Sequence, residues 1–314
     1  MKNKLIRSLV ITVVVGIILS VSIVIVVGLK DGKQATSLIH WNHWLIILSL
    51  TIIHIILRFI RWQYYLILLK HKIALTPSFA CYLSGLALTM TPGKVGETLR
   101  SVYLKPYGIG YTDSVSAFFV ERYTDVLAVI ALSTLILAHY SGYQSVVVII
   151  CIVVFAILLI IRGSWFLSVL EHLQRKITGN RIKTIAIKLS NVLKSSSTLL
   201  SLLPLFIGFI IALMAWSIQG VAFYLILSYI NQSVSLSFAI GCYSLAILAG
   251  AVSFLPGGIG GTEAVMILLL LSIGITSSDA TIATLVTRIA TLWFAVAIGL
   301  TAFVYVELSR RNNI

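Results

Sequence analysis

Four carboxylates of this sequence lie within or beside long apolar stretches, where an ionisable side chain is costly and is a functional hypothesis by default. They are Glu97, Glu121, Asp125 and Glu263, and the chain of 314 residues has only nine acids. Glu97 and Arg100 are three residues apart, so their side chains can pair on one helix face. If Glu97 or Glu263 lacks a partner in one conformational state, burial favours its neutral form, and proton coupling becomes possible.

Arginines accompany these acids in the same apolar stretches. Glu121 and Asp125 share a helix face, with Arg122 between them, and Arg288 occupies the equivalent place later in the chain. Guanidinium groups at these positions can neutralise the charge of a phosphate. The alternative is that the charges pair only to lock the helices together, and the sequence leaves both roles open.

Two Pro-Gly turns interrupt apolar stretches. Proline and glycine end helices, and glycine lets a backbone approach a ligand closely. A half-helix that restarts after such a turn offers free N–H groups and the positive end of its dipole to an anion, for which a phosphate is suited. Close packing of the hairpins is the alternative role of the glycines. The candidate residues are Pro92, Gly93, Lys94 and Gly96 in the first turn, and Pro256, Gly257, Gly258, Gly260 and Gly261 in the second.

A polar stripe follows one face of an expected helix at spacings of three and four residues. It consists of Thr51, His54, Arg58, Arg61 and Tyr65. We expect Arg58 and Arg61 to follow an anionic headgroup through the cytoplasmic half of the membrane. Snorkelling to the interface is the alternative, and it fits Arg61 better than Arg58.

Composition places these residues in a membrane. The chain is 59% hydrophobic and 10% charged, with a mean hydropathy of +1.07, whereas a soluble domain has roughly 25% charged residues. The net charge of +14 comes from Lys and Arg residues that lie mostly between apolar runs, which is typical of contact with an anionic leaflet. No nucleic-acid-binding motif, metal-ligand spacing or cofactor fingerprint is visible. We therefore expect no metal and no cofactor.

About six apolar runs are long enough to span a bilayer. They cover residues 9–29, 44–69, 114–138, 145–161, 204–230 and 280–306. Two further runs, 78–104 and 237–275, are broken in the middle by the Pro-Gly turns. Broken backbone at membrane depth is tolerated only where protein or a water-filled cavity surrounds it. We therefore expect two re-entrant helical hairpins.

Residues 162–201 form a polar insert in which basic residues far outnumber acids. Ile182, Ile185, Leu189 and Val192 recur in it at helical spacing. This pattern predicts a basic amphipathic helix on the cytoplasmic face. A plain linker between two halves is equally compatible.

A weak internal duplication relates the two halves. Residues 65–68 and 224–227 both read Tyr-Leu-Ile-Leu, and Ser-Phe-Ala occurs at 78–80 and again, at the same spacing, at 237–239. The Pro-Gly turns, the glutamates that follow them (Glu97 and Glu263) and arginines at equal distances beyond (Arg122 and Arg288) continue the match. The first repeat covers residues 44–138 and the second covers residues 204–306.

Positive charges orient the two copies. Basic residues near both termini, around the first hairpin and in the insert place these segments in the cytoplasm, whereas the loops at 139–144 and 229–237 have no Lys or Arg. The repeats are then inverted, as in secondary transporters. The sequence thus predicts an all-α polytopic membrane protein, one integral membrane domain over residues 1–314. It has about six spanning helices plus two re-entrant hairpins in an inverted repeat, and both termini are cytoplasmic.

The turn Thr-Pro-Gly-x-x-Gly-Glu at residues 91–97, followed by Glu121-Arg122, resembles the lysylphosphatidylglycerol synthase transmembrane-region family, also called flippase-like. So does the run Leu-Pro-Gly-Gly-Ile-Gly-Gly-Thr-Glu at residues 255–263, with an Arg in the following helix. The resemblance implies lipid translocation, as in the flippase half of the multiple peptide resistance factor. The sequence ends at Ile314, close to the last predicted helix, so we expect flipping without the soluble synthase domain of the fused relatives.

These observations predict a lipid flippase of the cytoplasmic membrane and not an enzyme. Its substrate is an anionic phospholipid or a polyprenyl-phosphate-linked lipid, and a separate synthase is a possible partner. Two alternatives remain open. One is a membrane-embedded transferase that acts on lipid-linked sugars, with Glu97 or Asp125 as its base. The other is a non-transporting scaffold for a cell-envelope synthase.

Overall fold

The computed structural model describes residues 39–138, 145, 148–149, 152 and 180–312. Every regular element in this part of the chain is a helix. Three of the described helices are long and apolar enough to cross a membrane: Trp41–Leu68, Leu202–Tyr229 and Ser277–Arg310. The prediction of an all-α membrane protein is confirmed. The predicted spans at 9–29 and 145–161 lie outside the described residues, except for four positions of the second.

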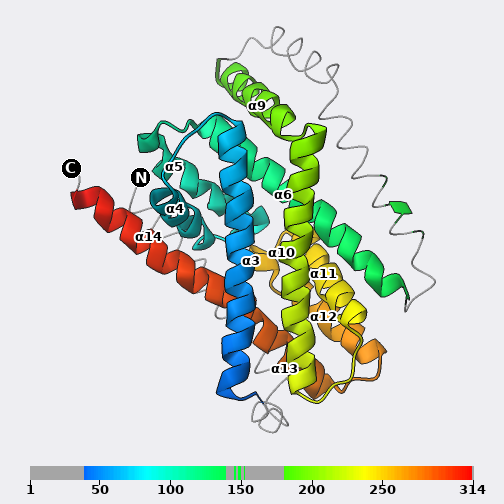
Figure 1. Ribbon diagram of the computed structural model, residues 1–314. Helices are drawn as coiled ribbons and strands as arrows, with labels where there is room; N and C mark the ends of the chain where they lie inside the picture. Colours follow the sequence, from blue (N-terminus) through cyan, green and yellow to red (C-terminus); the bar gives the residue numbers. More distant parts are fainter. Residues whose placement is uncertain (1–38, 139–144, 146–147, 150–151, 153–179, 313–314) are drawn as a thin grey trace.

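Helices α3 (Trp41–Leu68) and α10 (Leu202–Tyr229) form the centre of the molecule, where they pack together and run in opposite directions (Figure 1). Each helix has 28 residues, which corresponds to about 42 Å at 1.5 Å per residue. This exceeds the roughly 30 Å of a hydrocarbon core, so either helix can span a bilayer. A Cβ at Gly208 would lie 2.0 Å from the hydroxyl oxygen of Tyr65, so glycine permits their close contact.

The two central helices end in the same way, which fixes the register of the repeat. Lys70 and Asn231 each take a left-handed backbone conformation, with φ of 64° and 61°, and close the two helices in the Schellman arrangement. The helices that follow, α4 (Leu75–Leu86) and α11 (Leu236–Val252), then begin at equal distances from these residues. This register places Cys81-Tyr82 opposite Cys242-Tyr243, two residues away from the register predicted by the Tyr-Leu-Ile-Leu match.

Both broken apolar runs double back on themselves as hairpins. In the first, α4 is followed by the 3₁₀ helix η1 (Pro92–Leu99) and α5 (Arg100–Leu104). A Cβ at Gly85 would lie 3.1 Å from the carbonyl oxygen of Glu97, so the two arms are in contact. In the second, α11 is followed by the short turn η5 (Pro256–Gly258) and α12 (Gly261–Ser272). A Cβ at Gly250 would lie 2.0 Å from the Oγ1 atom of Thr262.

The tips of the two hairpins meet in the interior. Met90 and Ile259, one from each tip, pack with Leu292 and Val296 in a small buried cluster. The remaining elements also correspond between the halves. After the turn η2 (Lys105–Tyr107), α6 (Tyr111–Ser133) continues into η3 (Thr134–Ala138), and α13 (Ser277–Arg288) continues through the π-helical turn η6 (Ile289–Trp293) into α14 (Phe294–Asn312).

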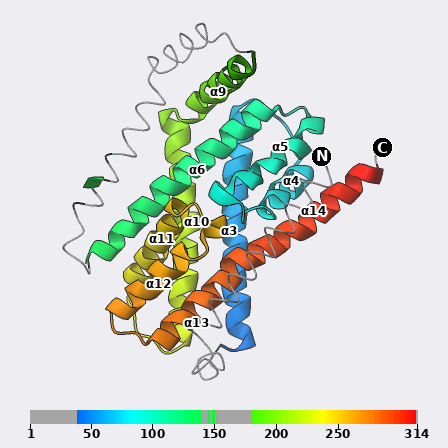
Figure 2. The same ribbon diagram turned by 180° about the vertical axis from the view of Figure 1, so that it is seen from behind.

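These long helices cross-pack between the halves: α4 packs on α14, and α11 packs on α6. Figure 2 shows α6 and α14 running in opposite senses. Glycine again allows the close approach, because a Cβ at Gly299 in α14 would lie 2.2 Å from the backbone nitrogen of Ala87. Small residues at such contacts are typical of membrane helices. The exchange of partners between halves is the arrangement that an inverted repeat produces.

Corresponding polar contacts join the same pair of elements in the two halves, at opposite ends of the molecule. His71, just after α3, lies 2.7 Å from Asp113 in the first turn of α6. Gln232, just after α10, donates a hydrogen bond of 3.0 Å to Asp279 in the first turn of α13. Each contact ties the loop after a central helix to the start of a long outer helix.

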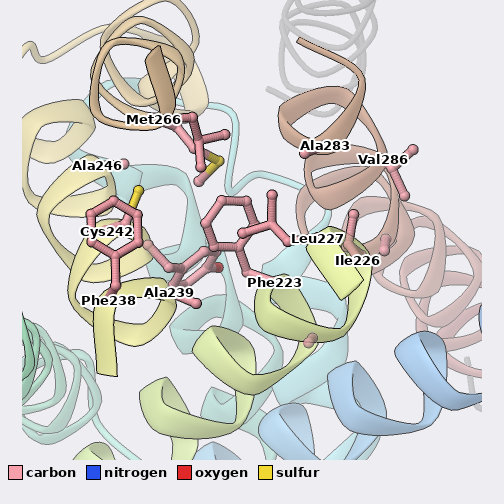
Figure 3. Close-up of a cluster of buried hydrophobic side chains, with 14 of the residues drawn as sticks. Phe223, Ile226, Leu227, Phe238, Ala239, Cys242, Ala246, Met266, Ala283 and Val286 are labelled. Atoms are coloured by element: carbon pink, nitrogen blue, oxygen red, sulfur yellow. The ribbon is translucent and has the colours of Figure 1, made fainter. Parts of the chain in front are cut away.

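The apolar core consists of two large clusters and the small one at the hairpin tips. In the cluster of the second half, Phe223 of α10 is fully buried and lies among Phe238, Cys242 and Met266 of the second hairpin (Figure 3).

The predicted insert at 162–201 contains helix α9 (Asn180–Leu199), which packs on α6. The Oγ of Ser195 donates to Asp113 at 3.0 Å. The part of the insert before residue 180 lies outside the described residues.

Candidate functional site

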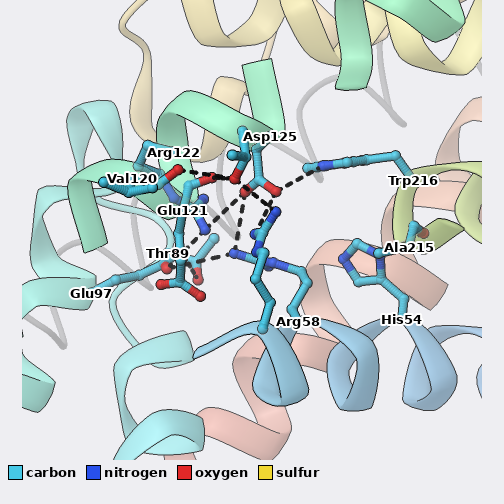
Figure 4. A network of polar contacts seen from close by, with 12 residues as sticks. His54, Arg58, Thr89, Glu97, Val120, Glu121, Arg122, Asp125, Ala215 and Trp216 are labelled. Carbon is cyan, nitrogen blue, oxygen red and sulfur yellow. Dashed lines mark hydrogen bonds and ion pairs between the residues drawn. The ribbon is translucent and has the colours of Figure 1, made fainter. Parts of the chain in front are cut away.

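Asp125 is the centre of a buried network of arginines and acids (Figure 4). Its Oδ1 atom accepts hydrogen bonds from Arg61 at 2.7 Å and from the indole Nε1 of Trp216 at 3.1 Å. Its Oδ2 atom lies 3.0 Å from Arg122 and 3.7 Å from Arg58. The carboxylate therefore links α3, α6 and α10.

Arg100 and Glu121 form a second pair, in which both side chains are almost completely buried. The guanidinium of Arg100 also lies over the indole ring of Trp62, 3.7 Å from its centroid, as a cation–π contact. These surroundings hold Arg100 between the first hairpin and the helices α3 and α6. The structure thus pairs Arg100 with Glu121, and not with Glu97 as the sequence analysis considered.

Glu97 connects the first hairpin to the network. Its Oε2 atom lies 3.9 Å from Arg58 and 3.8 Å from Arg122, and its Oε1 atom accepts from Thr89 at 3.2 Å. The backbone of Pro92, Gly93 and Lys94 lies in η1, whereas their side chains lie outside what the structure describes. The amide of Gly96 donates to the Oγ1 of Thr91 at 2.7 Å.

In the second half, Glu263 and Arg288 form a separate buried pair. The Nε of Arg288 donates to the Oε1 of Glu263 at 2.6 Å, and its Nη2 donates to the carbonyl oxygen of Gly257 at 2.7 Å. The Oε2 of Glu263 accepts from the amide of Gly260 at 2.7 Å. The chain's own carboxylate therefore stands at the N-terminus of α12, where the sequence analysis expected an external anion.

A cavity of about 290 Å³ lies between the two hairpins and the central helices. Its lining includes Thr51, His54 and Arg58 from the middle of α3, and Trp216 and Gln219 from the middle of α10. The cavity is therefore near the midpoint of both 28-residue helices. Most of its lining is apolar, with a few polar groups, as in sites that bind amphipathic molecules.

Six of the predicted site residues line this cavity: Arg58, Arg122, Asp125, Gly257, Gly258 and Arg288. Glu97 and Glu263 do not line the cavity, but they form ion pairs with the arginines that do. Pro256, Gly260 and Gly261 shape the second turn; Gly260 has a φ of 90°, which favours glycine.

The polar and aromatic residues of the lining that were not predicted include Trp216, Gln219 and Tyr243. Gln219 is the one amide side chain in α10, and an amide within so long an apolar run is a signal that points to a site. The repetition of Cys-Tyr at 81–82 and 242–243 is a comparable signal for Tyr243.

The snorkelling role considered for Arg61 is wrong. Its side chain is fully buried and donates to Thr124 at 3.1 Å as well as to Asp125. Snorkelling would leave the guanidinium at the interface. The reason lies in α6, whose Asp125 pairs with Arg61 in the interior of the protein.

The half-buried Arg122 adds a positive charge to buried charges that otherwise balance in the described residues. Four buried arginines (Arg58, Arg61, Arg100 and Arg288) face four buried carboxylates (Glu97, Glu121, Asp125 and Glu263), whereas the side chain of Arg122 is 19% exposed. The buried Nε atoms of two arginines that line the cavity, Arg58 and Arg122, have no hydrogen-bond acceptor. Arg122 lines the cavity and is partly exposed, so its positive charge would stabilise an anion there.

Comparison with known proteins places the chain among membrane proteins of one family. The family model described as the lysylphosphatidylglycerol synthase TM region matches residues 13–299. A UPF0104 membrane protein of Methanothermobacter thermautotrophicus is 24% identical over 322 residues, which cover 94% of each chain. A second UPF0104 membrane protein of this organism is 34% identical over 91 residues, 29% of this chain and 27% of the relative. The protein belongs to the lysylphosphatidylglycerol synthase transmembrane-region family.

Proposed function

We propose that this protein moves an anionic lipid, either a phospholipid or a polyprenyl-phosphate-linked lipid, between the leaflets of the cytoplasmic membrane. The observation that carries the proposal is the cavity near the middle of α3 and α10, lined by Arg58, Arg122 and Arg288. The positive charge of Arg122, which exceeds the balanced buried charges and lines the cavity, favours a ligand that brings an anionic oxygen.

The inverted arrangement of the halves supports transport over catalysis. Discontinuous segments that meet at the midpoint between inverted repeats are the design of secondary transporters. In this chain the tips of the two hairpins meet beside the cavity through Met90 and Ile259. We propose that the lipid is moved without a change in its covalent bonds, and that a separate synthase supplies it.

The distribution of charge supports a cytoplasmic location for the C-terminus. In the described part of the chain, Lys70 and Lys72 follow α3, Lys105 begins η2, Lys194 lies in α9 and Arg310 lies near the end of α14. Figure 1 shows the end of α3, α9 and the end of α14 in the same half of the molecule. The loops at the other end, residues 231–235 and 273–276, have no Lys or Arg. Positive residues mark the cytoplasmic side, and by the predicted topology the N-terminus is on the same side.

Reconstitution in vesicles tests the transport function. Fluorescent phosphatidylglycerol and a short polyprenyl phosphate are incorporated as trace lipids, and a membrane-impermeant reductant reports exchange between leaflets. We expect the wild type to move at least one of the two lipids and Arg122→Gln to lose this movement. Arg310→Gln removes the same charge from an exposed position on α14 and should move lipid as the wild type does. Equal exchange by Arg122→Gln and wild type would refute the assigned site.

A further inference from the structure

In the described structure, the exposed part of the cavity lining is a single short stretch. Nearly all residues that line the cavity are buried or half-buried; the exposed ones are Ala251, Phe254 and Leu255. This stretch runs from the end of α11 to the start of η5. Phe254 is 72% exposed and Leu255 is 47% exposed. The polar interior is therefore continuous with the outer surface through residues 251–255, which we call the side opening.

The surface of the side opening is largely apolar and carries no charge. Its five residues are Ala, Val, Ser, Phe and Leu, without a charge, and Val252 is 69% exposed. The cavity behind it reaches Trp216 and Gln219 at the middle of α10. In a membrane-spanning protein, a surface at this depth meets lipid hydrocarbon.

The first hairpin differs at the corresponding residue. Alignment of Pro92 with Pro256 pairs Met90 with Phe254. Met90 is completely buried in the cluster at the hairpin tips, whereas Phe254 is mostly exposed. Phe254 also has a φ of 53°, a left-handed conformation that is unfavourable for an aromatic residue. Strained backbone that persists in a packed turn is found preferentially at ligand sites and switch regions.

The size of the cavity limits what it encloses. At about 290 Å³ it is at the lower end of small-molecule sites, which measure roughly 300–1,000 Å³. This volume suits a headgroup, and the hydrocarbon chains of a lipid must then lie elsewhere. The side opening is the exposed apolar surface that is continuous with the cavity.

We propose that the side opening holds the hydrocarbon chains of a bound lipid where they leave the cavity, with Phe254 in contact with the chain segment next to the headgroup. This inference rests on the proposed function and narrows it, because the ligand must then be a lipid with its chains in the bilayer, and not free phosphate. Arg122 and Arg288 hold the headgroup, and residues 251–255 hold the beginning of the chains.

Photo-crosslinking at two matched phenylalanines tests this arrangement. Phe254 or Phe206 is replaced by p-benzoylphenylalanine in the full chain; Phe206 in α10 is 62% exposed and does not line the cavity. The vesicles contain trace phosphatidylglycerol in excess phosphatidylcholine. We expect position 254 to capture phosphatidylglycerol about tenfold above its share of the bilayer, a ratio that one hydrogen bond to a charged group can give. Position 206 should capture the two lipids in bulk proportion.

Two further arms separate the possible outcomes. Arg122→Gln should reduce the enrichment at position 254 to the bulk proportion, and millimolar inorganic phosphate should leave it unchanged. Bulk proportions at position 254 in the wild-type background, or loss of the enrichment on addition of phosphate, would overturn the side opening as a lipid site. Exchange without enrichment would leave the proposed transport intact and remove this inference. Enrichment without exchange would support the lipid site and refute transport.

Discussion

Replacement of Asp125 by Asn should destabilise the protein far more than the same change at Asp113. Asp125 is buried and faces Arg61 at 2.7 Å, Arg122 at 3.0 Å and Arg58 at 3.7 Å. Glu121 is already paired with Arg100. When Asp125 is neutralised, the nearby carboxylate that remains for these guanidinium groups is Glu97, which lies near Arg58 and Arg122. Removal of one partner from a buried ion pair costs about 3–5 kcal/mol, a large part of the roughly 5–15 kcal/mol of a typical stability.

Asp113 is the matched control. It pairs with His71 at 2.7 Å, but the two side chains are 30% and 20% exposed. Solvent screens such a pair, so Asp113→Asn should cost no more than about 1 kcal/mol. The free energy of unfolding is measured by titration with a denaturing detergent in mixed micelles. Equal losses for the two variants, or a loss below about 1 kcal/mol for Asp125→Asn, would refute the reasoning from burial.

Two other stability predictions follow from the second half and from the helix contacts. Glu263→Gln and Arg288→Met should each cost about 3–5 kcal/mol, and the double variant should cost clearly less than their sum, because the two side chains form one buried pair; additive losses would contradict this pairing. Gly299→Ala should cost about 1–3 kcal/mol or more, because its Cβ would lie 2.2 Å from the backbone of Ala87. Gly110→Ala, where nothing lies within 4 Å of the new Cβ, should stay within about 0.5 kcal/mol, and thermal unfolding of both variants in detergent checks the difference.

The sequence predicts the architecture well because breaks and repeated motifs survive in an apolar chain. The Pro-Gly turns mark both hairpins, and the glutamates and arginines after them align the halves. The register of the central helices differs by two residues from the predicted one, because short matches arise easily by chance in a chain rich in Leu and Ile. The helix ends at Lys70 and Asn231 supply the register, and their left-handed conformations are not evident from residue type.

The site is predicted in part. Arg58, Arg122, Asp125 and Arg288 converge on one cavity, as their intramembrane positions suggest. The partner of each charge is not predictable from local spacing, because pairs such as Arg61 with Asp125 join helices that are far apart in the sequence. A charged residue three positions away on the same helix is only one of several ion-pair partners that a folded membrane domain provides.

Charge-selective lipid exchange by the wild-type protein tests the central claim most directly. Phosphatidylglycerol and a short polyprenyl phosphate are each compared with phosphatidylcholine, and every exchange rate is corrected for protein-free vesicles. The cavity with its excess of arginine predicts that at least one of the two anionic lipids is exchanged at least about tenfold faster than phosphatidylcholine, the ratio expected from one hydrogen bond to a charged group. Equal rates for all three lipids, from protein that is folded by the unfolding assay, would contradict an anion-selective site between the two hairpins.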